Sequence, residues 1–332
     1  MTGISPAPSR SLDRLARLLG VAFVATYCGA IAVLGDRLLD VPHLPDTGPG
    51  WYFWKLAEPT VTSRAVVWGL YAAHQLANFW LIAHAQSQAR ATISGLHPFN
   101  VWALVLNALF VLVHLGQTHL TYDGLAQDVH VFSSLASVAV LLVWVLLMEN
   151  GRRGLFVGRK APLSSDVVAF ARKYHGYFFS WAIVYTFWYH PAEATPGHLM
   201  GFFYLLLILL QGSLFFTRAH TEVWWTTTLE VMVLAHGTMV AVMQGQGLWP
   251  MFFFGFGAMF VFTQAWGLAW PKWSKVALVL AWATGAAVVY AGRGVGKLNE
   301  VIRIPFIDYV GVFVLTGVLW LGLRAVRARQ VG

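Results

Sequence analysis

Long apolar segments recur along the whole chain and constrain its fold more than any other feature of the sequence. Each is about 20 residues long, which is the length that an α-helix needs to cross the hydrocarbon core of a bilayer. Only 11% of the residues are charged and 58% are hydrophobic, whereas a water-soluble domain carries about a quarter charged residues. No alternating pattern of about ten residues indicates a β-barrel. The sequence therefore predicts an all-α, polytopic integral membrane helix bundle.

Ten of these segments are candidate spans. They cover approximately residues 15–35, 64–86, 98–120, 127–148, 167–189, 197–217, 221–243, 248–270, 274–292 and 305–325. With the N-terminus in the cytoplasm, sixteen of the 22 Lys and Arg residues fall on the cytoplasmic side and six fall on the outer side. Because basic residues concentrate on the cytoplasmic side of membrane proteins, we expect about ten transmembrane helices with both termini cytoplasmic. The expected location is a bacterial-type inner membrane or a plasma membrane. A cleaved signal peptide over the first segment would not change the orientation of the rest.

Two counts exclude other classes of protein. Cys28 is the single cysteine, so the chain forms no intrachain disulfide and no cysteine-based metal site. The net charge of +8 is explained by loop residues that set orientation, so we expect the lipid bilayer as a partner and no nucleic acid.

The ten segments differ in their polar content, although we expect residues 1–332 to form a single transmembrane domain. Segments between about 64 and 243 carry ordered polar side chains and are expected to be functional. Segments between about 248 and 325 are rich in aromatic residues, Ala and Gly, and are expected to form a scaffold.

Polar side chains inside the functional segments fall on single helix faces. In the second segment, Tyr71, His74, Gln75 and Asn78 follow the spacing i, i+3, i+4, i+7 and so share one helix face. Asn107 lies on a polar face of the third segment. Lipid cannot hydrogen-bond these groups, so they are expected to face the bundle. We predict that Tyr71, Gln75, Asn78 and Asn107 shape a cavity. The alternative role is interhelical hydrogen bonding, worth about 0.6 kcal/mol per contact.

Glu230 is the acidic residue nearest the middle of a predicted span. An unpaired carboxylate there would be costly, so we expect it to carry a proton or to pair with a histidine or a bound cation. Glu230 and His74 are the predicted catalytic residues.

Histidines converge on one side of the predicted bundle. The topology places seven of the twelve in the outer half of the second to seventh spans: His74, His114, His119, His130, His190, His198 and His236. Imidazole is the commonest protein metal ligand, and a histidine-rich set suits iron, copper or haem better than calcium or magnesium. All of the seven except His74 are predicted metal ligands. The segment 114–130 and the turn 190–198 are expected to form the centre of this site.

A haem-binding form of the site uses the spacing of histidines along two spans. His175 and His190 lie fifteen residues apart, and His220 and His236 lie sixteen apart. Fifteen residues return to a similar helix face better than sixteen do. His175, His190 and His236 are accordingly the predicted cofactor-binding residues.

These features favour a membrane metalloprotein with oxidoreductase activity. A His-ligated iron, copper or haem centre near the outer face would act on a lipid-soluble substrate or a quinol. Two alternatives stay open: a proton-coupled transporter that uses the polar stripes and Glu230, and a non-catalytic membrane assembly subunit.

Overall fold

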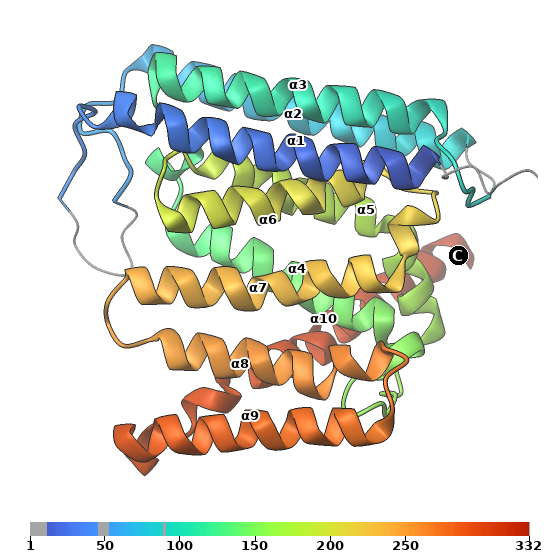
Figure 1. The fold of residues 1–332 in the computed structure, drawn as a ribbon. Helices are drawn as coiled ribbons and strands as arrows, with labels where there is room; N and C mark the ends of the chain where they lie inside the picture. The colour runs from blue at the N-terminus through green and yellow to red at the C-terminus, as the bar shows by residue number, and fades with distance from the viewer. Residues whose placement is uncertain (1–11, 46–52, 89–90, 332) are drawn as a thin grey trace, which may run out of the picture. The chain divides into compact units, whose positions relative to one another are not determined.

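A computed structural model describes residues 12–45, 53–88 and 91–331, and within these ranges the chain is helical and contains no β-strand (Figure 1). The α-helices of the described ranges are α1 (Leu12–Leu34), α2 (Val61–Gln88), α3 (Pro98–Thr121), α4 (Val131–Arg153), α5 (Ser165–Tyr189), α6 (Pro196–Ser213), α7 (Val223–Met243), α8 (Trp249–Phe262), α9 (Lys272–Arg293) and α10 (Glu300–Val331). Each predicted segment overlaps one of these helices, so the all-helical prediction is confirmed, although the segment predicted over 248–270 is helical in α8 only as far as Phe262.

Seven segments of the described chain are long and apolar enough to cross a membrane. They begin at α1, α3, α4, α6, α7, α9 and α10. The helix α8 has only 14 residues, about 21 Å at 1.5 Å per residue, which is shorter than a bilayer core of about 30 Å. Apolar side chains such as Trp102 and Leu109 on α3 are exposed, as contact with lipid requires. A count of ten spans with both termini cytoplasmic stays a prediction.

The chain forms two compact units. Unit 1 comprises the described residues as far as Val131 together with Ile183–Thr226, and unit 2 comprises Phe132–Ala182 and the described residues from Thr227 onward. One boundary falls after the first residue of α4, and the others fall inside α5 and α7, so each unit contains parts of α5 and α7. A single transmembrane domain stays a prediction.

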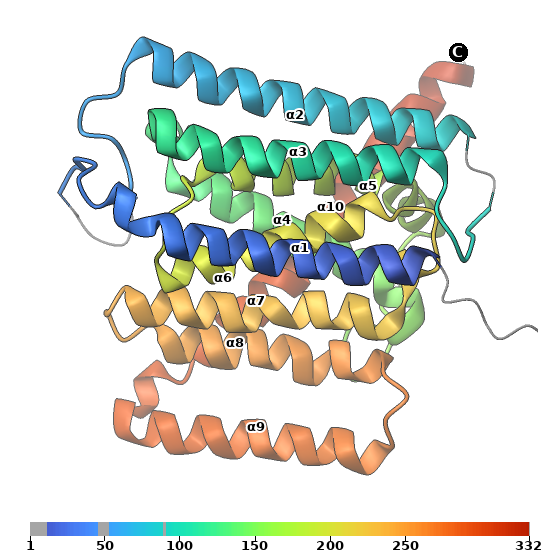
Figure 2. The same cartoon turned by 45° about the horizontal axis from the view of Figure 1, so that its top comes forward.

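Unit 1 is built on α1, α2, α3 and α6, with α2 beside α3 (Figure 2) and α1 against α6. The helices α1 and α6 approach each other closely at Gly20, where a Cβ atom would lie 2.4 Å from Leu210 Cδ1. The end of α5 supplies the largest fully buried side chains of the unit, Phe187, Trp188 and Tyr189. The core of unit 1 therefore lies where the end of α5 meets α3 and α6.

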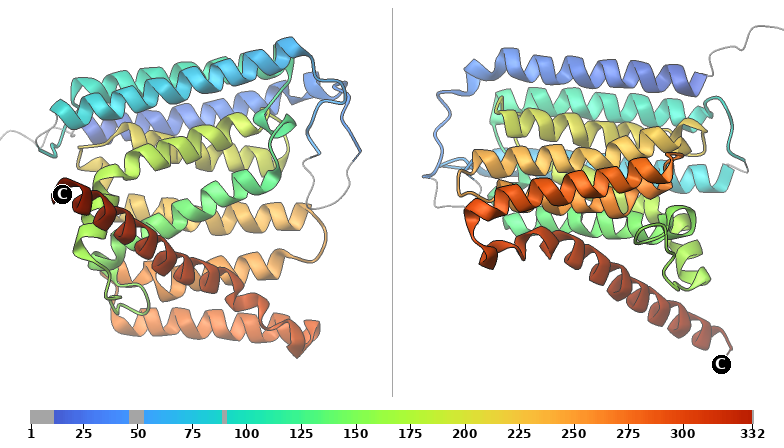
Figure 3. Two further views of the ribbon diagram at one scale, coloured as in Figure 1. Left: turned by 180° about the vertical axis from the view of Figure 1, so that it is seen from behind. Right: turned by 60° about the horizontal axis from the view of Figure 1, so that its bottom comes forward.

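Unit 2 is built around α8, which packs against α9 and α10 (Figure 3). A Cβ atom on Gly255 of α8 would lie 2.9 Å from Ile304 Cδ1 of α10, so glycine permits this close contact. A second cluster joins Leu147 of α4, Ala171 of α5 and Val312 of α10, all of them fully buried. Unit 2 thus has an apolar core of its own.

Candidate functional site

The segment 114–130 comprises the last turns of α3 and the connection to α4. The helix ends at Tyr122, which has a positive φ of 35° and donates its backbone N–H to Thr118 O. Gly124 then passes close to the last turn of α5, since a Cβ atom there would lie 2.5 Å from Tyr189 O. Because a side chain at this position would collide with the α5 backbone, glycine is required here. The connection also brings Asp123 and Asp128 toward Arg64 of α2.

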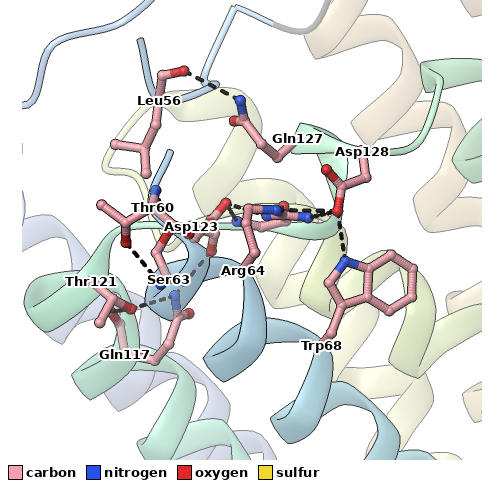
Figure 4. A network of polar contacts seen from close by, with 11 residues as sticks. Leu56, Thr60, Ser63, Arg64, Trp68, Gln117, Thr121, Asp123, Gln127 and Asp128 are labelled. Atoms are coloured by element: carbon pink, nitrogen blue, oxygen red, sulfur yellow. Dashed lines mark hydrogen bonds and ion pairs between the residues drawn. The ribbon is translucent and has the colours of Figure 1, made fainter. Parts of the chain in front are cut away.

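Arg64 of α2 binds both aspartates of the segment (Figure 4). Its Nη1 donates to Asp123 Oδ1 at 2.6 Å and to Gly124 O at 2.9 Å. Its Nε donates to Asp128 Oδ2 at 3.1 Å, and Trp68 Nε1 donates to the same oxygen at 2.8 Å. Asp123 is buried, so its charge is balanced by a cation held at contact distance. Sequence reasoning missed Arg64, whose only signal was a basic residue at the start of an apolar segment.

A second polar chain joins the end of α3 to the loops that follow α1 and α5 in unit 1. Tyr122 Oη donates to Glu193 Oε1 at 2.5 Å, and His43 Nε2 lies 2.6 Å from the same hydroxyl. Burial raises the pKa of the Glu193 carboxyl, and the hydrogen bond from Tyr122 partly opposes that rise. Burial lowers the pKa of His43. Folding therefore shifts both groups toward their neutral forms relative to the unfolded chain.

His114 is buried in unit 1, and both of its ring nitrogens have protein partners. Nε2 donates to the backbone oxygen of His190 at 2.9 Å, and Nδ1 lies 3.2 Å from Tyr27 Oη. The ring lies against Phe187, with 4.4 Å between the ring centroids. In this arrangement His114 joins α1 and α3 to the loop between α5 and α6, and neither nitrogen has a lone pair left for a metal.

His74 is held in the same way. Its Nε2 donates to Asn107 Oδ1 at 2.8 Å, and its Nδ1 accepts from Trp188 Nε1 at 3.1 Å. Asn78 Nδ2 donates to the same Asn107 oxygen at 3.0 Å. Asn107 Nδ2 in turn donates to Ser213 Oγ of α6 at 2.8 Å. This chain crosses three helices of unit 1.

An apolar cavity of about 270 Å³ lies among α1, α3 and α6, and the polar chain reaches its wall. Asn107 and Ser213 line it, and the remaining lining side chains, such as Phe23 and Leu206, are apolar. Asn78 contacts Asn107 as described, but neither it nor Gln75 lines the cavity. Tyr71 packs on Tyr185, with 6.1 Å between the ring centroids. The structure thus places one of the four predicted cavity residues in a cavity wall.

The other predicted metal ligands are spread over both units. The rings of His190 and His198 are neighbours, with centroids 5.5 Å apart, and His198 Nδ1 lies 2.8 Å from Thr195 Oγ1. His119 lies on α3 and His130 directly precedes α4. The described part of the chain contains no group of three or more His, Cys, Asp or Glu residues placed to hold a metal ion. Binding of iron, copper or haem stays a prediction.

Two of the predicted haem-binding residues, His175 and His236, belong to unit 2, whereas the third, His190, belongs to unit 1. The predicted proton carrier Glu230 also belongs to unit 2. His175 Nδ1 donates to Arg172 O at 2.7 Å. Glu230 is buried and its Oε2 accepts from Arg153 Nη1, at the end of α4. The partner of Glu230 is thus Arg153, one of the basic residues that the sequence placed on the cytoplasmic side. The role of Glu230 as a proton carrier stays a prediction.

No protein-family model matches the chain, and no curated protein or solved structure matches it significantly.

Replacing Arg64 with glutamine should destabilise the protein by about 3 kcal/mol, because Asp123 would be left buried without its cation. Thermal unfolding of the purified protein in detergent measures the effect. The matched control is Arg327→Gln, whose pair with Asp166 is exposed and should be worth about 0–1 kcal/mol. Equal losses in the two variants would contradict a structural role for the Arg64 network.

Replacing Glu193 with glutamine should flatten the dependence of stability on pH. Because the pKa of Glu193 is raised in the folded state, the folded protein binds this proton more tightly than the unfolded chain. Its contribution to stability is complete below the ordinary pKa and is lost as pH rises through the raised pKa. Thermal unfolding between about pH 4 and about pH 7 should therefore show a smaller decline in the variant. The exposed residue Glu58 supplies the control Glu58→Gln, which should retain the decline of the parent protein.

Proposed function

We propose that this chain is a multi-pass membrane protein that binds a lipid-soluble molecule in the cavity among α1, α3 and α6. The observation that carries the proposal is the composition of the cavity wall. Apolar side chains line about 270 Å³, and the polar atoms of Asn107 and Ser213 interrupt them at one place. Ligand pockets in proteins have this character, with a mostly apolar wall and a few polar groups that set orientation.

The polar side of the cavity suits a ligand with a hydrogen-bond acceptor. Asn107 Nδ2 carries two hydrogens and gives one to Ser213 Oγ, so a second hydrogen stays available to a ligand. The Asn107 oxygen is held by His74 and Asn78. This support keeps the amide in one orientation. A quinone or a similar molecule, with a carbonyl head and an apolar body, matches both parts of the wall.

The membrane orientation proposed for the chain has both termini in the cytoplasm and ten spans. The asymmetry of Lys and Arg supports it, since sixteen of 22 fall on the side assigned to the cytoplasm. In unit 1 this orientation places the Arg64 network and the Glu193 chain at the outer face. It places the cavity between the two faces.

Binding is tested with a short-chain benzoquinone, whose contact with tryptophan quenches protein fluorescence. The substitution Ala108→Phe fills the cavity, since Ala108 is one of its lining residues, and it should weaken binding at least about tenfold, or about 1.4 kcal/mol. The matched control Leu109→Phe changes the exposed neighbour on α3 and should bind as the parent protein does. Saturable binding that is equal in both variants, or no saturable binding in the parent protein, would contradict the proposal.

Redox chemistry at a His-ligated centre is a separate proposal that rests on the histidine content of unit 1. A visible absorption spectrum and metal analysis of the purified protein test it together. An iron, copper or haem centre should appear in one or both measurements. A colourless and metal-free preparation that still binds the benzoquinone would contradict the centre and leave ligand binding intact.

A further inference from the structure

A small cavity in unit 2 joins charged side chains from three helices. It is lined by Arg153 of α4, Glu230 of α7 and Asp308 of α10, and by Gln264, which follows α8. The other lining residues are apolar. Its volume of about 10 Å³ is about the room that one water molecule needs. Arg153 and Asp308 are only 2% and 4% exposed, so both lie inside the unit.

Arg153 has more hydrogen-bond donors than its pair with Glu230 uses. Its Nη1 donates to Glu230 Oε2, whereas its Nε and Nη2 are buried without an acceptor among the described residues. A buried donor without a partner is unfavourable, and a guanidinium group cannot lose its proton to avoid this. Because Arg153 lines the cavity, these N–H groups indicate that the cavity binds a small acceptor. A water molecule fits its volume.

The charges of the three ionisable side chains around the cavity balance only in one protonation state. Arg153 carries one positive charge and Glu230 one negative charge, so the pair is neutral. Asp308 adds a further negative charge when it is ionised and none when it is protonated. Since an uncompensated buried charge is strongly unfavourable, the cluster favours a proton on Asp308.

Neighbouring charged groups do not alter this balance. Glu149 and Arg152 of α4 both act electrostatically on Glu230, and they form an ion pair with each other that adds no net charge. The neighbour of Asp308 on α10 is Tyr309, whose hydroxyl lies 2.8 Å from Thr263 Oγ1. The proton on Asp308 is therefore the variable charge of the cluster.

We propose that Asp308 binds a proton and that its charge is coupled, through this cavity, to the Arg153–Glu230 ion pair. On binding, the carboxylate takes a proton from a hydronium ion, which becomes water. On release, the carboxylate competes with Glu230 for the N–H groups of Arg153, with a water molecule as the link. The site is independent of the lipid-soluble ligand proposed for unit 1, and its test does not involve that ligand.

The proton on Asp308 is measured by infrared difference spectroscopy of the full-length protein in lipid nanodiscs during a pH titration. A protonated carboxyl group has a carbonyl stretching band that a carboxylate lacks. Other carboxyl groups such as Glu193 also contribute to this band, so the component from Asp308 is identified by comparison: it should be present in the parent protein and absent from Asp308→Asn. It should persist in the control Glu149→Gln, which changes a carboxylate on α4 that does not line the cavity. Carboxyl bands in folded Asp308→Asn that equal those of the parent protein would overturn the proposal.

Coupling to the ion pair is measured in Glu230→Gln by the pH at which the Asp308 carbonyl band has half of its full intensity. Without the Glu230 charge, Arg153 stabilises ionised Asp308, so the midpoint should fall by at least about one pH unit, a tenfold change in proton affinity. An unchanged midpoint would overturn the coupling. If this variant does not fold, Arg153→Gln gives the second measurement. Glu230 and Asp308 then both lack a cation, so the spectrum should gain a carboxyl band from Glu230 beside the one from Asp308. Carboxyl bands unchanged from those of the parent protein would again overturn the coupling.

Discussion

Hydrogen bonds between buried polar side chains link the helices of each unit, because neither lipid nor an apolar core offers such groups a partner. In unit 1 the chain from His74 through Asn107 to Ser213 crosses three helices, and His114 ties α1 and α3 to the loop before α6. In unit 2 the corresponding link is the ion pair of Arg153 and Glu230. The polar contacts are directional and so select one register.

The same contacts give His74 and His114 a structural role. A metal ligand needs a free nitrogen lone pair, and in His74 and His114 both nitrogens are used by protein partners. Their hydrogen bonds instead hold the aromatic end of α5, where Phe187 and Trp188 are fully buried. In unit 1 the orientation of Asn107 depends on His74, so a histidine at a distance from the cavity still decides what its wall can bind. Histidine richness in this chain thus has a direct structural use.

The sequence predicted the helices well and the contacts between them poorly. Apolar length located every described α-helix, and the i, i+3, i+4, i+7 spacing placed His74 and Asn78 on one buried face. The pairing of Arg64 with Asp123 and Asp128 was missed, although all three residues stood out as charges beside apolar segments. Glu230 was recognised as a buried carboxylate that needs a partner, but histidine or a bound cation was expected where the structure has Arg153. Asp308 was not recognised at all, since one acidic residue in a segment treated as scaffold carries no periodic signal.

The sequence by itself determined that this chain is helical and apolar enough to lie in a membrane, because hydropathy and helix length act locally and depend on no partner. It also determined which faces of the helices are polar, through the fixed angle between successive residues. Only the tertiary structure decided which polar groups meet. Contacts such as Tyr27 with His114 join residues 87 positions apart, and no local rule specifies them. The cavity among α1, α3 and α6, and the one around Arg153, exist only after such distant side chains have found each other.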